Sequence, residues 1–275
     1  MVPGNLKLKT ENFIFAEPFT PRGIAAFARA GFSRLLLVQL VVALLATVSL
    51  AWFLDKNCFS TVAAAIERLP DTGKIVAGRL EWREDSPQMI LEGRLLAFDV
   101  DLDHSGRIHS AADVQIEFGR ESMRIYSFLG YSDFFYPLWP LPFNRVDLKP
   151  RWGAWSAEIL ALGTLGAFAG LLLSWTVLAT LYFLPAWLLG FFLNRDLKPA
   201  ASWRLSAAAL LPGALLMVTG ILLYNIGFLN LISLSFIFAG HFVVGWIYLV
   251  TSLFFVPRLA ETGHKKNPFT PASKP

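Results

Sequence analysis

The sequence is poor in cysteine, in charge and in catalytic motifs, and each shortage excludes a class of protein. Its one cysteine, Cys58, has no partner for an internal disulfide. Only 16% of the 275 residues are charged, which is too few for an ordinary soluble chain of this length. There are four histidines, and no P-loop, GxSxG, HExxH or CxxC pattern occurs. We therefore expect a protein that is not an enzyme and that holds no cofactor.

Apolar residues make up 55% of the chain and gather in four long runs. A helix of about 20 apolar residues crosses the roughly 30 Å hydrocarbon layer of a bilayer, because each residue rises about 1.5 Å. The runs therefore predict an all-α bundle of four transmembrane helices. We expect the second run to be one helix to about Pro185 with a short continuation along the membrane, and the fourth to be one helix bent near Gly240. The runs cover residues 35–54, 155–193, 205–224 and 228–256.

The distribution of charge predicts the orientation of these helices. Residues 1–34, 195–204 and 257–275 together hold twelve Lys and Arg against four acidic residues, whereas residues 55–151 hold twelve against fifteen. Cytoplasmic segments carry the excess of basic residues. We therefore expect both termini in the cytoplasm and residues 55–151 outside an inner (plasma) membrane. The basic residues are spread over three segments, which argues against a nucleic-acid partner.

Two segments beside the first apolar run have local signals of their own. Thr20 and Pro21 predict the start of a basic amphipathic helix that lies in the membrane interface and continues to Arg34. Beyond the run, residues 60–69 predict a short helix that Pro70 ends.

Residues 55–151 predict a small α+β domain. Alternating apolar and polar residues indicate strands, and we expect them to form an antiparallel sheet beside the helix over residues 60–69. Residues 126–143 are rich in aromatic residues and proline, which favours an anchor in the outer headgroup layer, with a ligand groove as the alternative. The expected strands lie at residues 80–82, 89–91, 96–102 and 114–118.

Three carboxylates form the sharpest chemical pattern of this domain. Asp99, Asp101 and Asp103 share one face if they lie on a strand, because side chains alternate between faces. Such a row is a weak candidate for a Ca²⁺ site, with His104 nearby. The carboxylates also alternate with apolar residues such as Val100, as a half-buried strand requires. We therefore favour a solvated strand face over a Ca²⁺ site.

Polar and small residues inside the apolar runs offer further candidates. His241, Asn230 and Tyr224 are possible members of an intramembrane polar site, although a structural role for His241 is the favoured interpretation. Gly166 and Gly170 form a GxxxG spacing, which favours close helix packing within the chain or between two copies. Pro212 lacks the N–H that its helix needs, so we expect a kink there.

Three stretches together resemble a known group. They are Pro18-Phe19-Thr20-Pro21 before the first run, Ile66-Glu67-Arg68-Leu69-Pro70 followed by Gly78-Arg79-Leu80-Glu81-Trp82, and Ala207-Ala208-Ala209-Leu210-Leu211-Pro212-Gly213 in the third run. The chain resembles the bacterial domain-of-unknown-function family 1189, a relative of the YIP (Ypt/Rab-interacting protein) membrane superfamily. The resemblance implies a YIP-like four-helix membrane fold with an inserted outer domain. It implies no activity and no catalytic residue.

These observations favour a binding role over a chemical one. We expect a scaffold, assembly or accessory subunit in the lipid bilayer, whose outer domain contacts a membrane or envelope protein, or a second copy of the chain. The alternative is a transport component or a lipid-handling protein with a pathway through the helices. Transport requires a chain of polar partners for His241, and the apolar runs hold few.

Overall fold

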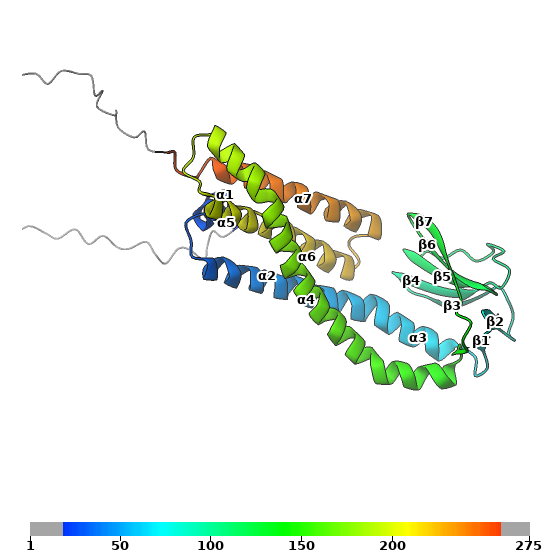
Figure 1. Cartoon of the computed structure of the whole chain (residues 1–275). Helices are drawn as coiled ribbons and strands as arrows, with labels where there is room; N and C mark the ends of the chain where they lie inside the picture. The colour runs from blue at the N-terminus through cyan, green and yellow to red at the C-terminus, as the bar shows by residue number, and fades with distance from the viewer. Residues whose placement is uncertain (1–18, 260–275) are drawn as a thin grey trace, which may run out of the picture. The chain divides into compact units, whose positions relative to one another are not determined.

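The computed structural model describes residues 19–259 (Figure 1). These residues fall into two compact units. One unit holds the described residues up to Ala43, together with Gly170–Leu215 and the residues from Gly240 onward. The other holds Leu44–Ala169 and Leu216–Ala239. The expectations for residues 1–18 and 260–275, including the basic residues there, lie outside the described part.

Four helices are long and apolar enough to cross a membrane, as the four apolar runs predict. Their outward surfaces carry many exposed apolar side chains, such as Leu44, Leu162 and Phe236. Such a surface suits contact with lipid rather than with water. The four helices, counted with their continuations, are Phe32–Arg68, Arg145–Phe192, Pro199–Asn225 and Leu231–Leu253.

The first of these helices continues well beyond the end expected at residue 54. α2 (Phe32–Leu54) passes through a π-helical turn, η2 (Asp55–Phe59), into α3 (Ser60–Arg68). The short helix expected over residues 60–69 is therefore confirmed, but it is the last part of a longer helix. π-turns are rare and occur often at functional sites, because they redirect side chains within a helix.

The second long helix differs most from the expectation. α4 (Arg145–Phe192) is one helix of 48 residues, so it begins before residue 151, which the sequence places in the outer domain. The expected break near Pro185 is wrong, since that residue lies inside the helix. At about 1.5 Å per residue, α4 is longer than a bilayer is thick. Its start is fixed by Asn144, whose Oδ1 accepts from the Asp147 N–H at 2.9 Å.

The third apolar run forms two helices in sequence. α5 (Pro199–Ala209) and α6 (Leu211–Asn225) are separated at Leu210, two residues before Pro212, whose missing N–H predicts a kink. α7 (Leu231–Leu253) is a single helix.

α5 belongs to the core of the first unit. Its residues Ala207, Ala208 and Ala209 are fully buried. α1 (Pro21–Phe27) packs against α5 and begins as predicted, because Thr20 Oγ1 accepts from the Gly23 N–H at 3.0 Å. It ends at Phe27 rather than at Arg34.

The second unit contains two sheets. β1 (Lys74–Val76), β2 (Arg79–Glu81) and β8 (Leu141–Pro142) form a small antiparallel sheet in the order β2-β1-β8. The larger sheet has five strands in chain order: β3 (Gln88–Glu92), β4 (Leu96–Val100), β5 (Val114–Phe118), β6 (Ser122–Ser127) and β7 (Gly130–Phe135). The expected antiparallel pairing is wrong at one place, because β4 and β5 are parallel.

The five-stranded sheet has one apolar face and one charged face. Phe98 and Val100 of β4 lie on the apolar face and join Ala65 and Leu69, from the α3 region, in one hydrophobic core. On the opposite face lie Ala97 and Asp99 of β4, whose partners on β5 are Gln115 and Glu117. The segment after β4 crosses this face before β5 begins, because a parallel pair needs a crossover connection.

Candidate functional site

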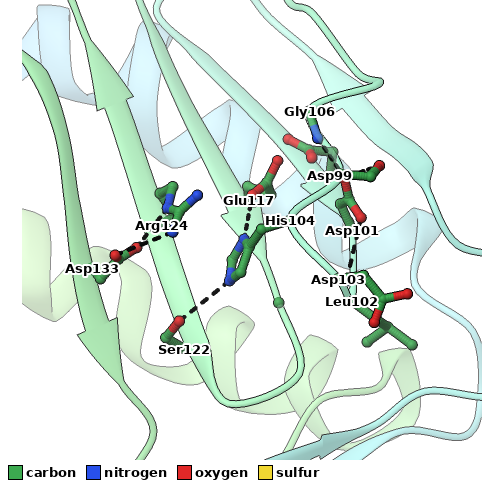
Figure 2. Close-up of polar contacts among 12 residues, drawn as sticks. Asp99, Asp101, Leu102, Asp103, His104, Gly106, Glu117, Ser122, Arg124 and Asp133 are labelled. Atoms are coloured by element: carbon green, nitrogen blue, oxygen red, sulfur yellow. Dashed lines mark hydrogen bonds and ion pairs between the residues drawn. The ribbon is translucent and has the colours of Figure 1, made fainter.

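The strand register brings four charged residues into one row across the charged face. Asp99 of β4 is paired with Glu117 of β5, which is paired with Arg124 of β6, which is paired with Asp133 of β7. We call these four residues the charged row (Figure 2). Their side chains share one face because cross-strand partners point to the same side of a sheet.

Asp99 is a fully buried carboxylate at one end of the charged row. Its Oδ1 accepts from Gln115 Nε2 at 2.9 Å, and its Oδ2 is buried with no hydrogen-bond partner. Burial, together with the nearby carboxylates of Glu117 and Asp101, raises the pKa of Asp99 to about 7, against the lowering effect of the hydrogen bond from Gln115. Asp99 therefore gains or loses a proton near neutral pH.

Glu117 is equally buried and is covered by His104. His104 Nδ1 contacts Glu117 Oε1, while its Nε2 lies 3.3 Å from Ser122 Oγ (Figure 2). The ring reaches this place because His104 has a left-handed backbone, with φ of 51°. Gly119 leaves the space for it, since a Cβ there would lie 2.2 Å from His104 Nε2. The second oxygen of Glu117 is buried without a hydrogen-bond partner.

Asp101 and Asp103 lie in the segment after β4 and have different surroundings. The Asp101 carboxylate is buried and accepts from Ser105 Oγ at 2.7 Å and from the Gly106 N–H at 3.2 Å. Asp103 is exposed and lies 3.4 Å from Arg120. Asp101 Oδ1 also lies 3.4 Å from the Asp103 N–H, the contact of an Asx-type turn, in which a carboxylate accepts from the backbone two residues further on.

The interpretation of these carboxylates as a solvated strand face is therefore wrong for Asp99 and Asp101. The crossover segment covers them, which a pattern of alternation does not reveal. Asp103 lies beyond the strand and does not continue the face. Between residues 19 and 259, no group of three or more His, Cys, Asp and Glu side chains is placed to hold a metal ion.

The charged row becomes more exposed toward the edge strand β7. The side chains of Glu117, Arg124 and Asp133 are 1%, 22% and 32% exposed. Arg124 binds Asp133 with two hydrogen bonds, of 2.6 and 3.2 Å, and lies 4.7 Å above the ring of Tyr131. Arg124 lowers the pKa of Asp133, so Asp133 stays charged. The row thus stiffens β6 and β7 and is reached by solvent from the side of β7.

β7 presents an open, aromatic edge. All six of its residues are exposed, and Phe135 is 81% exposed. The Tyr136 N–H donates to Glu121 O at 3.2 Å and so continues the β6–β7 ladder. Because hydrogen bonds alternate along an antiparallel pair, Tyr131, Asp133 and Phe135 direct their N–H and C=O groups away from β6.

The sequence did not predict β7. Its strand lies within residues 126–143, whose aromatic and proline content indicated an interfacial anchor. With both faces exposed, β7 shows no apolar–polar alternation, which is the signal that identified β4 and β5. The two loop residues between β6 and β7, Phe128 and Leu129, also lack the Asn-Gly or Asp-Gly pattern that predicts a hairpin.

Two of the candidate intramembrane residues have individual partners. Tyr224 is fully buried, and its hydroxyl donates to Asp113 Oδ2 at 2.5 Å. Asn230 precedes α7, where its Oδ1 accepts from the Ser233 N–H at 2.8 Å. Each therefore has a structural role in the second unit. His241 belongs to the first unit, where its carbonyl lies close to Gly213; a Cβ at Gly213 would be 2.4 Å from it.

The GxxxG pair does not pack against another part of the described chain. A Cβ added at Gly166 or Gly170 would meet no atom within 4 Å among residues 19–259. Of the two interpretations, close packing within the chain is thus wrong. A contact with a second copy stays a prediction.

Within residues 19–259, the fold combines four helices that are long and apolar enough to cross a membrane with a small β domain, the combination of elements found in multi-pass membrane proteins. No protein-family model, no curated protein and no solved structure matches this chain.

Proposed function

We propose that the protein is a non-catalytic scaffold or accessory subunit of the cell inner membrane. In this proposal the termini are cytoplasmic, and the sheet domain is an extracytoplasmic module that binds an extended segment of an envelope protein. The family resemblance to the YIP-like membrane proteins is part of the same proposal and rests on the sequence pattern alone.

The observation that carries the proposal is the open edge of β7. Among residues 19–259, its outward N–H and C=O groups have no strand partner, and exposed aromatic side chains flank them. An extended peptide that adds to a sheet edge satisfies such groups and places alternate side chains beside the exposed aromatics. Lipid chains do not satisfy backbone groups, so a lipid-facing edge would leave them unpaired at a cost of several kcal/mol each.

A second copy of the chain fits this edge less well than another protein does. Two antiparallel β7 strands centred on Asp133 would place its carboxylate opposite that of the other copy. Like charges directly opposite each other destabilise a strand pair. Asp133 stays ionised beside Arg124, so this repulsion persists at neutral pH.

Photo-crosslinking in the cells that naturally produce the protein tests the proposal. A photoreactive phenylalanine at Tyr131, which is 63% exposed, should capture one specific envelope protein. Phe135→Pro removes one outward N–H of β7 and should abolish capture, because proline cannot donate to an added strand.

The matched control is Leu138→Pro. Leu138 is 78% exposed, close to the 81% of Phe135, but lies beyond β7, so this variant should capture the partner as the wild type does. Recovery of the chain crosslinked only to itself, or capture that Phe135→Pro leaves unchanged, would contradict the proposal.

A further inference from the structure

A cavity of about 350 Å³ lies where α6 ends and where the apolar part of the first long helix gives way to its polar continuation. Lys56 and Asn57 line it from η2, directly after the last residue of α2, and Asn225 lines it as the last residue of α6. Arg94 lines it from the loop between β3 and β4. If the apolar parts of these helices cross a bilayer, the points where they become polar lie at the level of the phospholipid headgroups.

The charge of this cavity is positive. Lys56 and Arg94 are its charged lining residues, and no acidic side chain lines it. Within the described part of the chain, neither cation forms an ion pair with a carboxylate. Two neighbouring cations without an acidic partner favour an anionic ligand.

The two cations are held in place by the carbonyl groups at the end of α6. Lys56 Nζ donates to Asn225 O at 2.8 Å, Arg94 Nη1 donates to Tyr224 O at 2.7 Å, and Arg94 Nη2 donates to Leu229 O. A purely structural reading would make both residues caps of α6. These bonds use only part of their capacity, because an ammonium and a guanidinium carry several N–H groups each.

One amide donor at the cavity has no acceptor. Asn225 Oδ1 accepts from Asn57 Nδ2 at 2.8 Å, and the Asn225 Nδ2 is buried without a hydrogen-bond partner among residues 19–259. The C-terminus of α6 contributes a partial negative charge of about half a unit, well below the charge of the two cations. A ligand rich in acceptor oxygens and negatively charged, such as a phosphate group, complements this set of donors.

The surroundings favour a lipid as the source of that phosphate. The Trp52 ring lies 5.6 Å from Lys56 Nζ, and tryptophan beside lysine is typical of membrane interfaces. Ile226, which lines the cavity, and the nearby Phe228 are 65% and 79% exposed. These side chains offer an apolar surface next to the two cations, as a headgroup joined to acyl chains requires.

We propose that Lys56 and Arg94 bind a phosphate group in this cavity, and that in the membrane it is the phosphate of a phospholipid headgroup. This site is independent of the β7 edge. Phe135→Pro should therefore leave phosphate binding unchanged, so that the two proposals can fail separately.

Native mass spectrometry of the full-length protein in detergent tests the site with three probes: phosphatidylglycerol, diacylglycerol and inorganic phosphate. The variant is Lys56→Gln with Arg94→Gln, and we expect its affinity for phosphatidylglycerol to fall about fivefold for each cation removed. The control is Lys74→Gln with Arg79→Gln, which removes the same charge from exposed residues of β1 and β2 and should bind as the wild type does.

Diacylglycerol lacks the phosphate and should bind weakly to every form. If inorganic phosphate binds as tightly as the lipid and its binding is lost in the double variant, the result supports the phosphate site but assigns it to free phosphate. Equal binding of diacylglycerol and phosphatidylglycerol, or lipid affinity that the double variant leaves unchanged, would overturn the proposal. If the double variant does not fold, Lys56→Gln alone keeps both Arg94 bonds and should still lose about fivefold.

Discussion

The buried carboxylate of Asp99 makes the stability of the sheet domain depend on pH. Its pKa is about 7 in the folded protein, against an ordinary value of 3.8. Between these values the folded state holds the proton more tightly than the unfolded state does. The stabilising contribution is therefore complete below the ordinary value and is lost as the pH rises toward 7.

The size of this effect follows from the two pKa values. Raising the pH from about 5.5 to about 8.5 should lower the free energy of opening the sheet by about 2 kcal/mol, which is about 30-fold in protection from exchange. Hydrogen-exchange mass spectrometry of the full-length protein, corrected for intrinsic exchange rates, measures this on peptides from β4 and β5.

Two variants isolate the contribution of Asp99. Asp99→Asn cannot ionise and still offers an oxygen to Gln115, so its protection should lose most of this dependence on pH. Asp103→Asn changes the same chemical group at a site that is 80% exposed, and it should keep the wild-type dependence. Two outcomes would refute the reasoning. One is protection from hydrogen exchange that rises with pH in the wild type, and the other is protection that falls with pH as much in Asp99→Asn as in the wild type.

Glycine positions give further predictions. Gly119→Ala should destabilise the sheet domain by about 1–3 kcal/mol, because its methyl group would displace the His104 ring. Hydrogen exchange of β5 measures this loss, and protection of β5 equal to that of the wild type would contradict the prediction. Gly213→Ala should lower the melting temperature of the purified protein, since its Cβ would meet the backbone of His241, whereas Gly163→Ala, which meets nothing within 4 Å, should leave it equal or higher. Equal melting temperatures for the two variants would argue against close packing at Gly213.

Much of the helical part could be predicted from the sequence. An apolar run long enough to cross a bilayer is a local property, so the runs located the four helices, and Pro212 located the break between α5 and α6. Thr20 and Pro21 identified the start of α1 for the same reason, because a helix cap depends on a few neighbouring residues.

The ends of the long helices were harder to predict. α3 and the first residues of α4 are helical although they carry charge. Hydropathy marks where a helix ceases to be apolar, not where its backbone hydrogen bonds cease. The π-turn η2, which brings Lys56 and Asn57 to the end of α6, had no signal in the sequence.

Alternation in the sequence found β4 and β5, but only the tertiary structure decided their pairing. Asp99 and Glu117 become neighbours through a parallel register, and the segment between the strands buries them. Similarly, β7 is identified by its pairing with β6 rather than by any pattern of its own. The composition of a segment determines whether it prefers a lipid environment and whether it forms a strand or a helix. Contacts between distant residues depend instead on which strands pair and which helix ends meet. The charged row and the cationic cavity both consist of such contacts.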